Sequence, residues 1–153
     1  MKQLIRKGVF ETNSSSAHSI TISNNVSIFD TIYPDYAGNI TLVGGEWGWE
    51  IKYYNDAETK ANYCVQDIVT TVYDNKTQKY VSALNVDKMI MLMKVISNHT
   101  GCNEIFFDKQ RIFDGYIDHQ SRGTTDEAFK SIDNLRNFIF NPESILKTDH
   151  DNH

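Results

Sequence analysis

The sequence predicts a single α+β domain, in which about three helices pack on one face of a mostly antiparallel sheet. Residues of high β propensity dominate the chain before Asp56, in short runs separated by Ser and Asn clusters. Helical periodicity appears only after Asp56. The 153 residues, 40% of them hydrophobic, are enough for one core without a disulfide or a metal. We expect this domain to span 1–148 and residues 149–153 to form a polar tail.

The first strands are expected at 4–10 and 18–22, as a pair joined by a polar loop. Two further strands follow at 26–32 and 40–43. Each run is rich in Val, Ile, Thr, Phe or Tyr and is bounded by residues that favour turns.

A strand with a marked alternation is expected at 46–54, directly after Gly44 and Gly45. Successive side chains of a strand point to opposite faces, so the large apolar residues share one face and the polar ones the other. The apolar set is Trp47, Trp49, Ile51 and Tyr53. The segment therefore predicts a strand that is buried on one side.

Helical spacing predicts three helices in the rest of the chain. The first spans 56–72 with Asp56 as its N-cap, and the second lies between an Asn85 cap and a Gly101 terminator. The third spans 125–140 and ends before a proline. We expect short strands at 104–107, 115–118 and 144–148.

Composition excludes several classes of function. Fifteen basic and twenty acidic residues give a net charge of -5, which argues against nucleic-acid binding through phosphate neutralisation. The N-terminal residues lack the apolar core of a secretory signal, and no run of apolar residues is long enough for a membrane span, so we expect a cytoplasmic protein without membrane association. Cys64 and Cys102 lack metal-site spacing and are expected to be reduced thiols.

The first candidate site is the polar loop between the two opening strands. It brings together hydroxyl, amide and imidazole groups, from Asn13, Ser14, Ser15, Ser16 and His18. Three interpretations stay open: a turn whose side chains bond their own backbone, a loop that binds a polar ligand, and a nucleophilic serine. Proximity in sequence does not make a Ser and a His a catalytic pair, because such pairs are defined by geometry.

The second candidate site follows the strand at 115–118. His119 could act as a general base oriented by Asp118, with Gln120 and Ser121 as further polar contacts. Adjacent strand residues point to opposite faces, however, so a surface turn with a solvated histidine is the other interpretation.

The third candidate site is the glycine and tryptophan segment with Glu46. Trp47 and Trp49 could stack on a base, a sugar or a partner side chain, or belong to a packed core strand. No glycine motif for phosphate binding is present. The acidic and histidine-containing tail at 149–153 could hold a metal or be frayed, and we assign no metal site.

Three segments of the chain resemble the blocks of an uncharacterised family of small bacteriophage and prophage proteins. They are Gly8-Val9-Phe10-Glu11-Thr12-Asn13-Ser14-Ser15-Ser16-Ala17-His18-Ser19 with its flanks, the segment 46–63, and Tyr116-Ile117-Asp118-His119-Gln120-Ser121. The resemblance implies a viral or prophage origin and expression in the host bacterial cytoplasm. It implies no activity for any residue.

The three candidate sites each place polar groups beside an apolar strand, and we expect them to gather around one pocket. Two classes of function follow. One is an accessory protein that binds a host protein or a small polar ligand, as an inhibitor or a sequestering protein. The other is a small hydrolase or transferase for a nucleotide-like substrate, with His18, His119 and Asp118 as catalytic candidates. The sequence identifies no cofactor and leaves the oligomeric state open.

Overall fold

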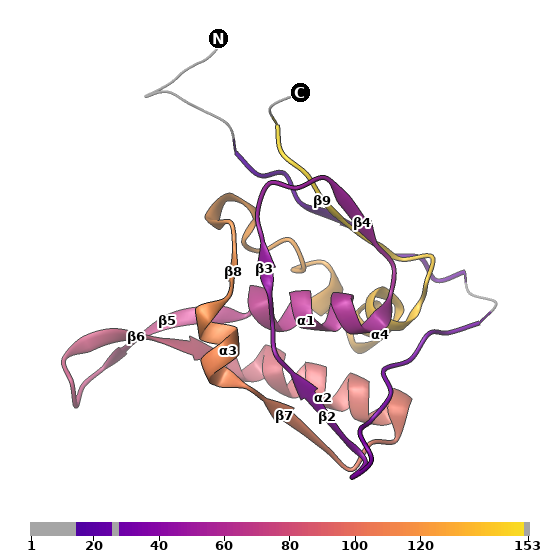
Figure 1. The fold of residues 1–153 in the computed structure, drawn as a ribbon, viewed down its shortest axis with the longest axis horizontal. Helices are drawn as coiled ribbons and strands as arrows, with labels where there is room; N and C mark the ends of the chain where they lie inside the picture. Colours follow the sequence, from indigo (N-terminus) through magenta and orange to yellow (C-terminus); the bar gives the residue numbers. More distant parts are fainter. Residues whose placement is uncertain (1–14, 26–27, 152–153) are drawn as a thin grey trace.

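The computed structural model describes residues 15–25 and 28–151 and shows an α+β fold, as predicted (Figure 1). The strands are β1 (Ser19–Thr21), β2 (Asn39–Leu42), β3 (Glu46–Trp47), β4 (Lys52–Tyr54), β5 (Val69–Asp74), β6 (Lys79–Leu84), β7 (Glu104–Phe107), β8 (Tyr116–Ile117) and β9 (Ile145–Thr148). The α-helices are α1 (Ala57–Asp67), α2 (Val86–Thr100), α3 (Lys109–Asp114) and α4 (Ile132–Phe140). Two short 3₁₀ helices, η1 (His119–Ser121) and η2 (Ala128–Lys130), complete the described elements.

The strands are divided among small sheets and do not form the single sheet that we expected. β9 lies between β1 and β4 in an antiparallel three-stranded sheet, and β5 pairs with β6 in an antiparallel hairpin. β2 pairs with β7 and β3 with β8, and both of these pairs are parallel. Helices α1 and α4 pack against each other between these sheets (Figure 1).

The first helix is shorter than predicted. Asp56 caps it as expected, because its carboxylate accepts a hydrogen bond from Thr59 N–H at 2.9 Å. The helix ends at Asp67, however, and Val69 and Val72 belong to β5 instead. These valines fit helical spacing, but the β-branched run at 69–72 fits a strand better once β6 is there to pair with it.

The second helix is confirmed at both ends. Asn85 accepts from Lys88 N–H at 3.1 Å, and Gly101 adopts the left-handed conformation with φ 68°. The third predicted helix is wrong in its first part, because α4 begins only after Ser131, whose hydroxyl accepts from Asn134 N–H. Helix α3, capped by Asp108, was not predicted.

The strand predicted at 46–54 is interrupted. Trp47 is buried in β3, but Trp49, Ile51 and Tyr53 are 49%, 52% and 67% exposed, so the expected buried face does not continue into β4. No strand forms at 28–32, the described part of the predicted strand at 26–32. The expected strand at 4–10 lies outside the described residues.

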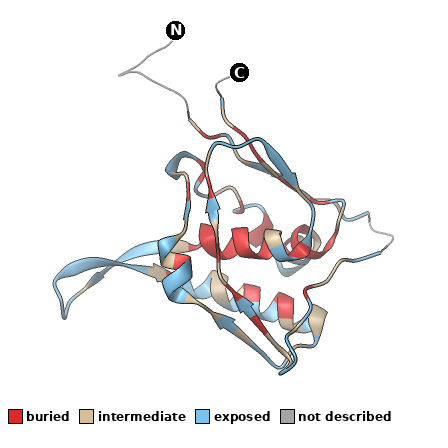
Figure 2. Ribbon diagram, viewed as in Figure 1, coloured by how far each residue is buried: buried red, intermediate tan, exposed pale blue. Residues whose placement is uncertain are grey.

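The core lies around α1 and α4, as the burial colours show (Figure 2). Nine of the eleven residues of α1 are buried, including the fully buried Lys60 and Tyr63. Cys64 is buried here too, and Cys102 is partly buried; both are free thiols.

Part of the expected tail continues the sheet. Asp149 accepts from Ala17 N–H and Asp151 N–H donates to Ser15, so 149–151 run antiparallel to 15–17 and are not frayed. Among the described helices, none is long and apolar enough to cross a membrane.

Candidate functional site

Ser16 joins two of the three candidate sites. Its hydroxyl lies 2.7 Å from Asp118 Oδ2 and 2.5 Å from the hydroxyl of Ser121. Ser16 belongs to the predicted polar loop, whereas Asp118 and Ser121 belong to the turn after β8. Both serines are buried, so these hydrogen bonds take the place of water. We call Ser16, His18, Tyr63, Asp118 and Ser121 the polar cluster.

His18 brings the third candidate site into the polar cluster. Its Nε2 lies 2.6 Å from the carbonyl oxygen of Gly48, and its Nδ1 lies 2.8 Å from the hydroxyl of Tyr63. A carbonyl can only accept, so Nε2 carries a hydrogen and donates it to Gly48. The main-chain N–H of His18 donates to the Ser121 hydroxyl at 3.2 Å. Both ring nitrogens and the main-chain N–H of His18 are therefore engaged.

Tyr63 of α1 lies beneath the polar cluster and was not predicted to belong to a site. Its ring is fully buried and stands edge-on to Trp47, with the ring centroids 5.1 Å apart. Burial raises the pKa of the Tyr63 hydroxyl well above its ordinary value, so this group stays protonated. The side chain was overlooked because it lies on a helix whose spacing indicated only a core stripe.

The three segments lie together, as the one-pocket hypothesis requires. The imidazole of His18 is not placed as a base for Ser16, because its two ring nitrogens contact Tyr63 and Gly48. The Ser16 hydroxyl contacts the Asp118 carboxylate and the Ser121 hydroxyl. His119 is 85% exposed in its side chain and lies 3.9 Å from Asp118. The polar cluster therefore joins segments of the chain, with its groups directed at one another.

The other predicted residues lie around the polar cluster. Ser15 bonds to the Asp151 carboxylate through its N–H and its hydroxyl. Gln120 is exposed and its N–H donates to Asp118 at 3.4 Å, and Glu46 is exposed on β3. Asn13 and Ser14 lie outside the described residues.

Gly44 and Gly115 lie where neighbouring segments leave no room for a side chain. Gly44 has φ 70°, and a Cβ there would collide with the amide of Gln66 on α1. A Cβ on Gly115 would collide with the carbonyl oxygen of Gly45, where the chain enters the β3–β8 pair. These glycines therefore let the main chain lie close to α1 and to the start of β8.

Two amides of α1 hold this glycine segment, and both were missed at the sequence level. Asn62 Oδ1 accepts from the N–H groups of Val43 and Gly44 at 2.8 and 3.0 Å. Gln66 accepts from Gly45 N–H at 3.1 Å and donates to the Ile112 carbonyl at 2.9 Å. Polar residues four apart within an otherwise buried helix were the available signal.

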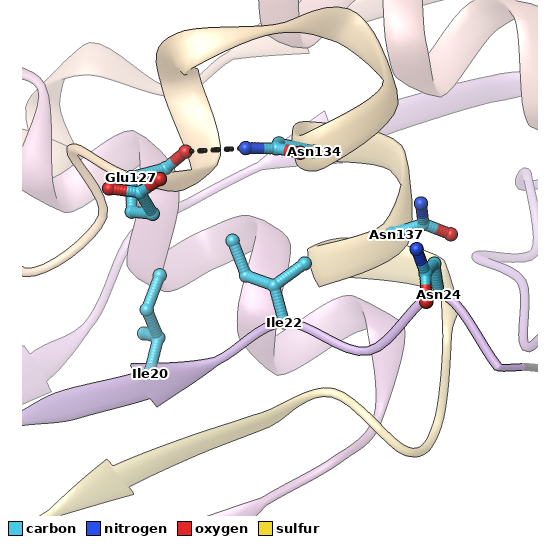
Figure 3. Close-up of a pocket in the computed structure, with 6 residues that line it drawn as sticks. All are labelled: Ile20, Ile22, Asn24, Glu127, Asn134 and Asn137. Carbon is cyan, nitrogen blue, oxygen red and sulfur yellow. Dashed lines mark hydrogen bonds between the residues drawn. The ribbon is translucent and has the colours of Figure 1, made fainter.

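A groove of about 390 Å³ lies between β1 and helix α4 (Figure 3). Its lining residues are Ile20, Ile22, Asn24, Glu127, Asn134 and Asn137. The two isoleucines point from the strand toward α4 (Figure 3). Its volume lies within the usual range of roughly 300–1,000 Å³ for sites of small ligands.

No metal centre is evident in the described part of the chain, because no three His, Cys, Asp or Glu side chains there are grouped to hold an ion. No protein-family model, no curated protein and no solved structure matches the chain. The resemblance to bacteriophage and prophage proteins stays a prediction.

Proposed function

We propose that this protein acts by binding another protein, and that the hairpin β5–β6 is the surface that it uses. One observation carries the proposal: the hairpin projects from one side of the molecule and is exposed along most of its length (Figures 1 and 2). Four of the six residues in each strand are exposed. An isolated two-stranded hairpin is only marginally stable in water, so a partner that covers it contributes stability.

Both faces of the hairpin present apolar side chains. Tyr73 and Tyr80 face each other across the strands with ring centroids 5.2 Å apart, and they are 49% and 74% exposed. On the opposite face Val72 pairs with Val81, and these side chains are 43% and 39% exposed. Aromatic residues of this kind are the usual anchors of protein interfaces.

The tip of the hairpin is held in shape before any partner arrives. The carboxylate of Asp74 accepts from Lys76 N–H at 2.9 Å and from the Thr77 hydroxyl at 3.2 Å. Gln78 N–H donates to the Asp74 carbonyl at 2.8 Å, with Gln78 in the left-handed region at φ 58°. A preorganised loop loses less conformational entropy on binding.

The charges at the tip of the hairpin and the free edges of its strands indicate which kind of partner it binds. Lys76 and Lys79 face solvent, and the Asp74 carboxylate is engaged in the turn, so the tip favours acidic groups. Among the described strands, β5 and β6 pair with each other alone. Apart from the Val69 carbonyl, which accepts from Arg122, their outer main-chain groups can therefore extend the sheet. The partner is thus a protein with an extended, acidic segment, and is a host cytoplasmic protein if the phage resemblance holds.

The second class of function, a hydrolase or transferase, has no comparable support. Its candidate groups are either engaged in the hydrogen bonds of the polar cluster or, like His119, exposed to solvent.

A photo-crosslinking amino acid placed at Tyr80 tests the proposal, with the same substitution at Tyr36 as its matched control. Both side chains are exposed, but Tyr36 lies outside the hairpin. Expressed in a bacterial cytoplasm, the protein should give a discrete heteromeric adduct from position 80 alone. A further Tyr73→Ser change should reduce that adduct about tenfold, as expected for loss of an anchor. Equal adducts from both positions, or an adduct of two copies of this chain, would contradict the proposal.

A further inference from the structure

The strand β1 has one edge that pairs with β9 and one that does not. Ala17 N–H donates to the Asp149 carbonyl at 3.0 Å, and Ile20 stands opposite Leu146. Hydrogen bonds alternate along an antiparallel pair, so the main-chain N–H and C=O of Ile20 point away from β9. They make no hydrogen bond within the described part of the chain. Ile20, which lines the groove between β1 and α4, therefore offers a main-chain donor and an acceptor that no described residue engages.

On its N-terminal side, the free edge of β1 ends at the polar cluster. The His18 N–H points the same way as that of Ile20, but it already donates to Ser121. A strand added to this edge can therefore begin at Ile20 and continue toward Asn24, along the groove lining.

Carboxamide groups line the opposite side and the far end of the groove. Asn134 donates to the main-chain carbonyl of Glu127 at 3.1 Å, which fixes its position on α4 (Figure 3). The side chains of Asn24 and Asn137 make no hydrogen bond to the described part of the chain. A carboxamide can donate to and accept from a peptide group at once, so these two side chains suit a main chain that reaches this end of the groove.

The charge of the groove is balanced. Glu127 is the one carboxylate among its lining residues, and Lys130 Nζ lies 3.1 Å from it. Two isoleucines form the apolar floor. The lining thus matches an uncharged backbone with an apolar side chain better than a charged ligand.

We propose that the groove between β1 and α4 binds an extended, uncharged peptide segment of another protein. The segment adds as a strand to the free edge at Ile20, its apolar side chain lies over Ile20 and Ile22, and Asn24 and Asn137 hold its main chain. This mode is strand addition, in which main-chain hydrogen bonds give affinity and alternate side chains give specificity. The site is separate from the hairpin and does not depend on the function proposed for it.

Titration of the full-length protein with the blocked peptide acetyl-Thr-Val-Thr-Val-Thr-amide, followed by NMR, tests the site. Binding should shift the Ile20 amide resonance and slow its hydrogen exchange. Two versions of the peptide test whether it binds as a strand in one register. One is N-methylated on the main-chain nitrogens of the threonines and the other on those of the valines. Because alternate amides face the same edge, one version should lose binding at least tenfold and the other should keep it.

The double variant Asn24→Ala/Asn137→Ala should weaken binding about tenfold or more, through loss of the hydrogen bonds that hold the main chain. Asn55→Ala is the matched control, since Asn55 is exposed and lies outside the groove. Crosslinking at the hairpin should be unchanged in the double variant.

Three results would overturn the proposal. The first is a peptide that leaves the Ile20 amide unaffected, and the second is equal binding of both N-methylated versions. The third is strong protection of the Ile20 amide without peptide, which would mean that another segment or a second copy of the chain already occupies the edge.

Discussion

The ammonium group of Lys60 lies 2.8 Å from the carbonyl oxygen of Asn141, at the end of helix α4. A second carbonyl, that of Ser144, lies at the same distance, and the lysine side chain is fully buried. A cation beside the last carbonyls of a helix is favourable for the helix dipole. Lys60 thus ties α1 to the segment between α4 and β9.

Replacing Lys60 with methionine should destabilise the protein by about 2–3 kcal/mol. Two buried carbonyls would lose their donor, although the apolar chain would still fill the space. Chemical denaturation monitored by circular dichroism measures the change. Lys130→Met, on an exposed lysine, is the control and should stay within about 0.5 kcal/mol of the parent. A Lys60→Met variant as stable as the parent would contradict this role.

The contribution of Lys60 should depend on pH. Burial lowers the pKa of Lys60 from 10.5 to about 8. Below pH 8 the lysine is protonated in both states, and the folded state carries the full cost of burying the charge. Between pH 8 and 10.5 the unfolded state binds more protons, so this cost disappears as the pH rises. The shift corresponds to the order of 3 kcal/mol.

The stability of the parent relative to Lys60→Met should therefore increase over that range. The comparison with the variant matters, because burial raises the pKa of Cys64 and of Tyr63, and both effects lower stability at high pH. Denaturation curves of both proteins at pH 7, 8.5 and 10 would show the trend. A constant difference would mean that Lys60 does not lose its proton in the folded protein.

Replacing the two tryptophans with alanine should reduce stability by very different amounts. Trp47→Ala should cost about 3–5 kcal/mol, because the ring is buried against Tyr63 and lies over Gly45. Trp49→Ala should change stability by no more than about 0.5 kcal/mol, since its ring is half exposed. Denaturation of both variants, followed by tyrosine fluorescence, measures these losses of stability. Equal losses in the two variants would contradict the structure.

The two histidines offer a second matched pair. His18→Ala should destabilise the fold by about 1–3 kcal/mol, because the buried Tyr63 hydroxyl loses a partner. His119→Ala should leave the melting temperature nearly unchanged, because its side chain is 85% exposed. Thermal melts of the two proteins at pH 7.5 provide the measurement. A larger loss from His119→Ala than from His18→Ala would refute the assignment.

Local signals in the sequence predicted elements with clear ends. Helix α2 follows from its Asn85 cap and its Gly101 terminator, and both caps form as expected. Helix α1 was extended too far because Val69 and Val72 fit two periodicities, and only the pairing with β6 decides between them. The division into small sheets depends on contacts between distant segments, which periodicity does not describe.

The polar cluster was predictable in part. Ser16 and Asp118 each lie beside an apolar strand in the sequence. From this feature we expected their segments to lie together, and they do. Tyr63 was missed because nothing in a helical pattern of apolar residues shows that one of them makes a hydrogen bond to a distant side chain. The groove between β1 and α4 could not be predicted, because periodicity does not say which strand lies beside which helix, and Ile20 and Asn137 carry no local sign of their proximity.

The pairing of 15–17 with 149–151 determines how the fold responds to mechanical tension. Ser15 and Asp151 lie at the same end of an antiparallel pair, so a force that separates them loads the hydrogen bonds one after another. Such peeling meets less resistance than sliding two strands past each other. The segment that carries Ser16 and His18 would leave first, and Asp118 and Tyr63 would lose their hydrogen bonds to it before the helices unfold. A force that pulls these two paired segments apart would therefore open the polar cluster before it reaches the buried helices.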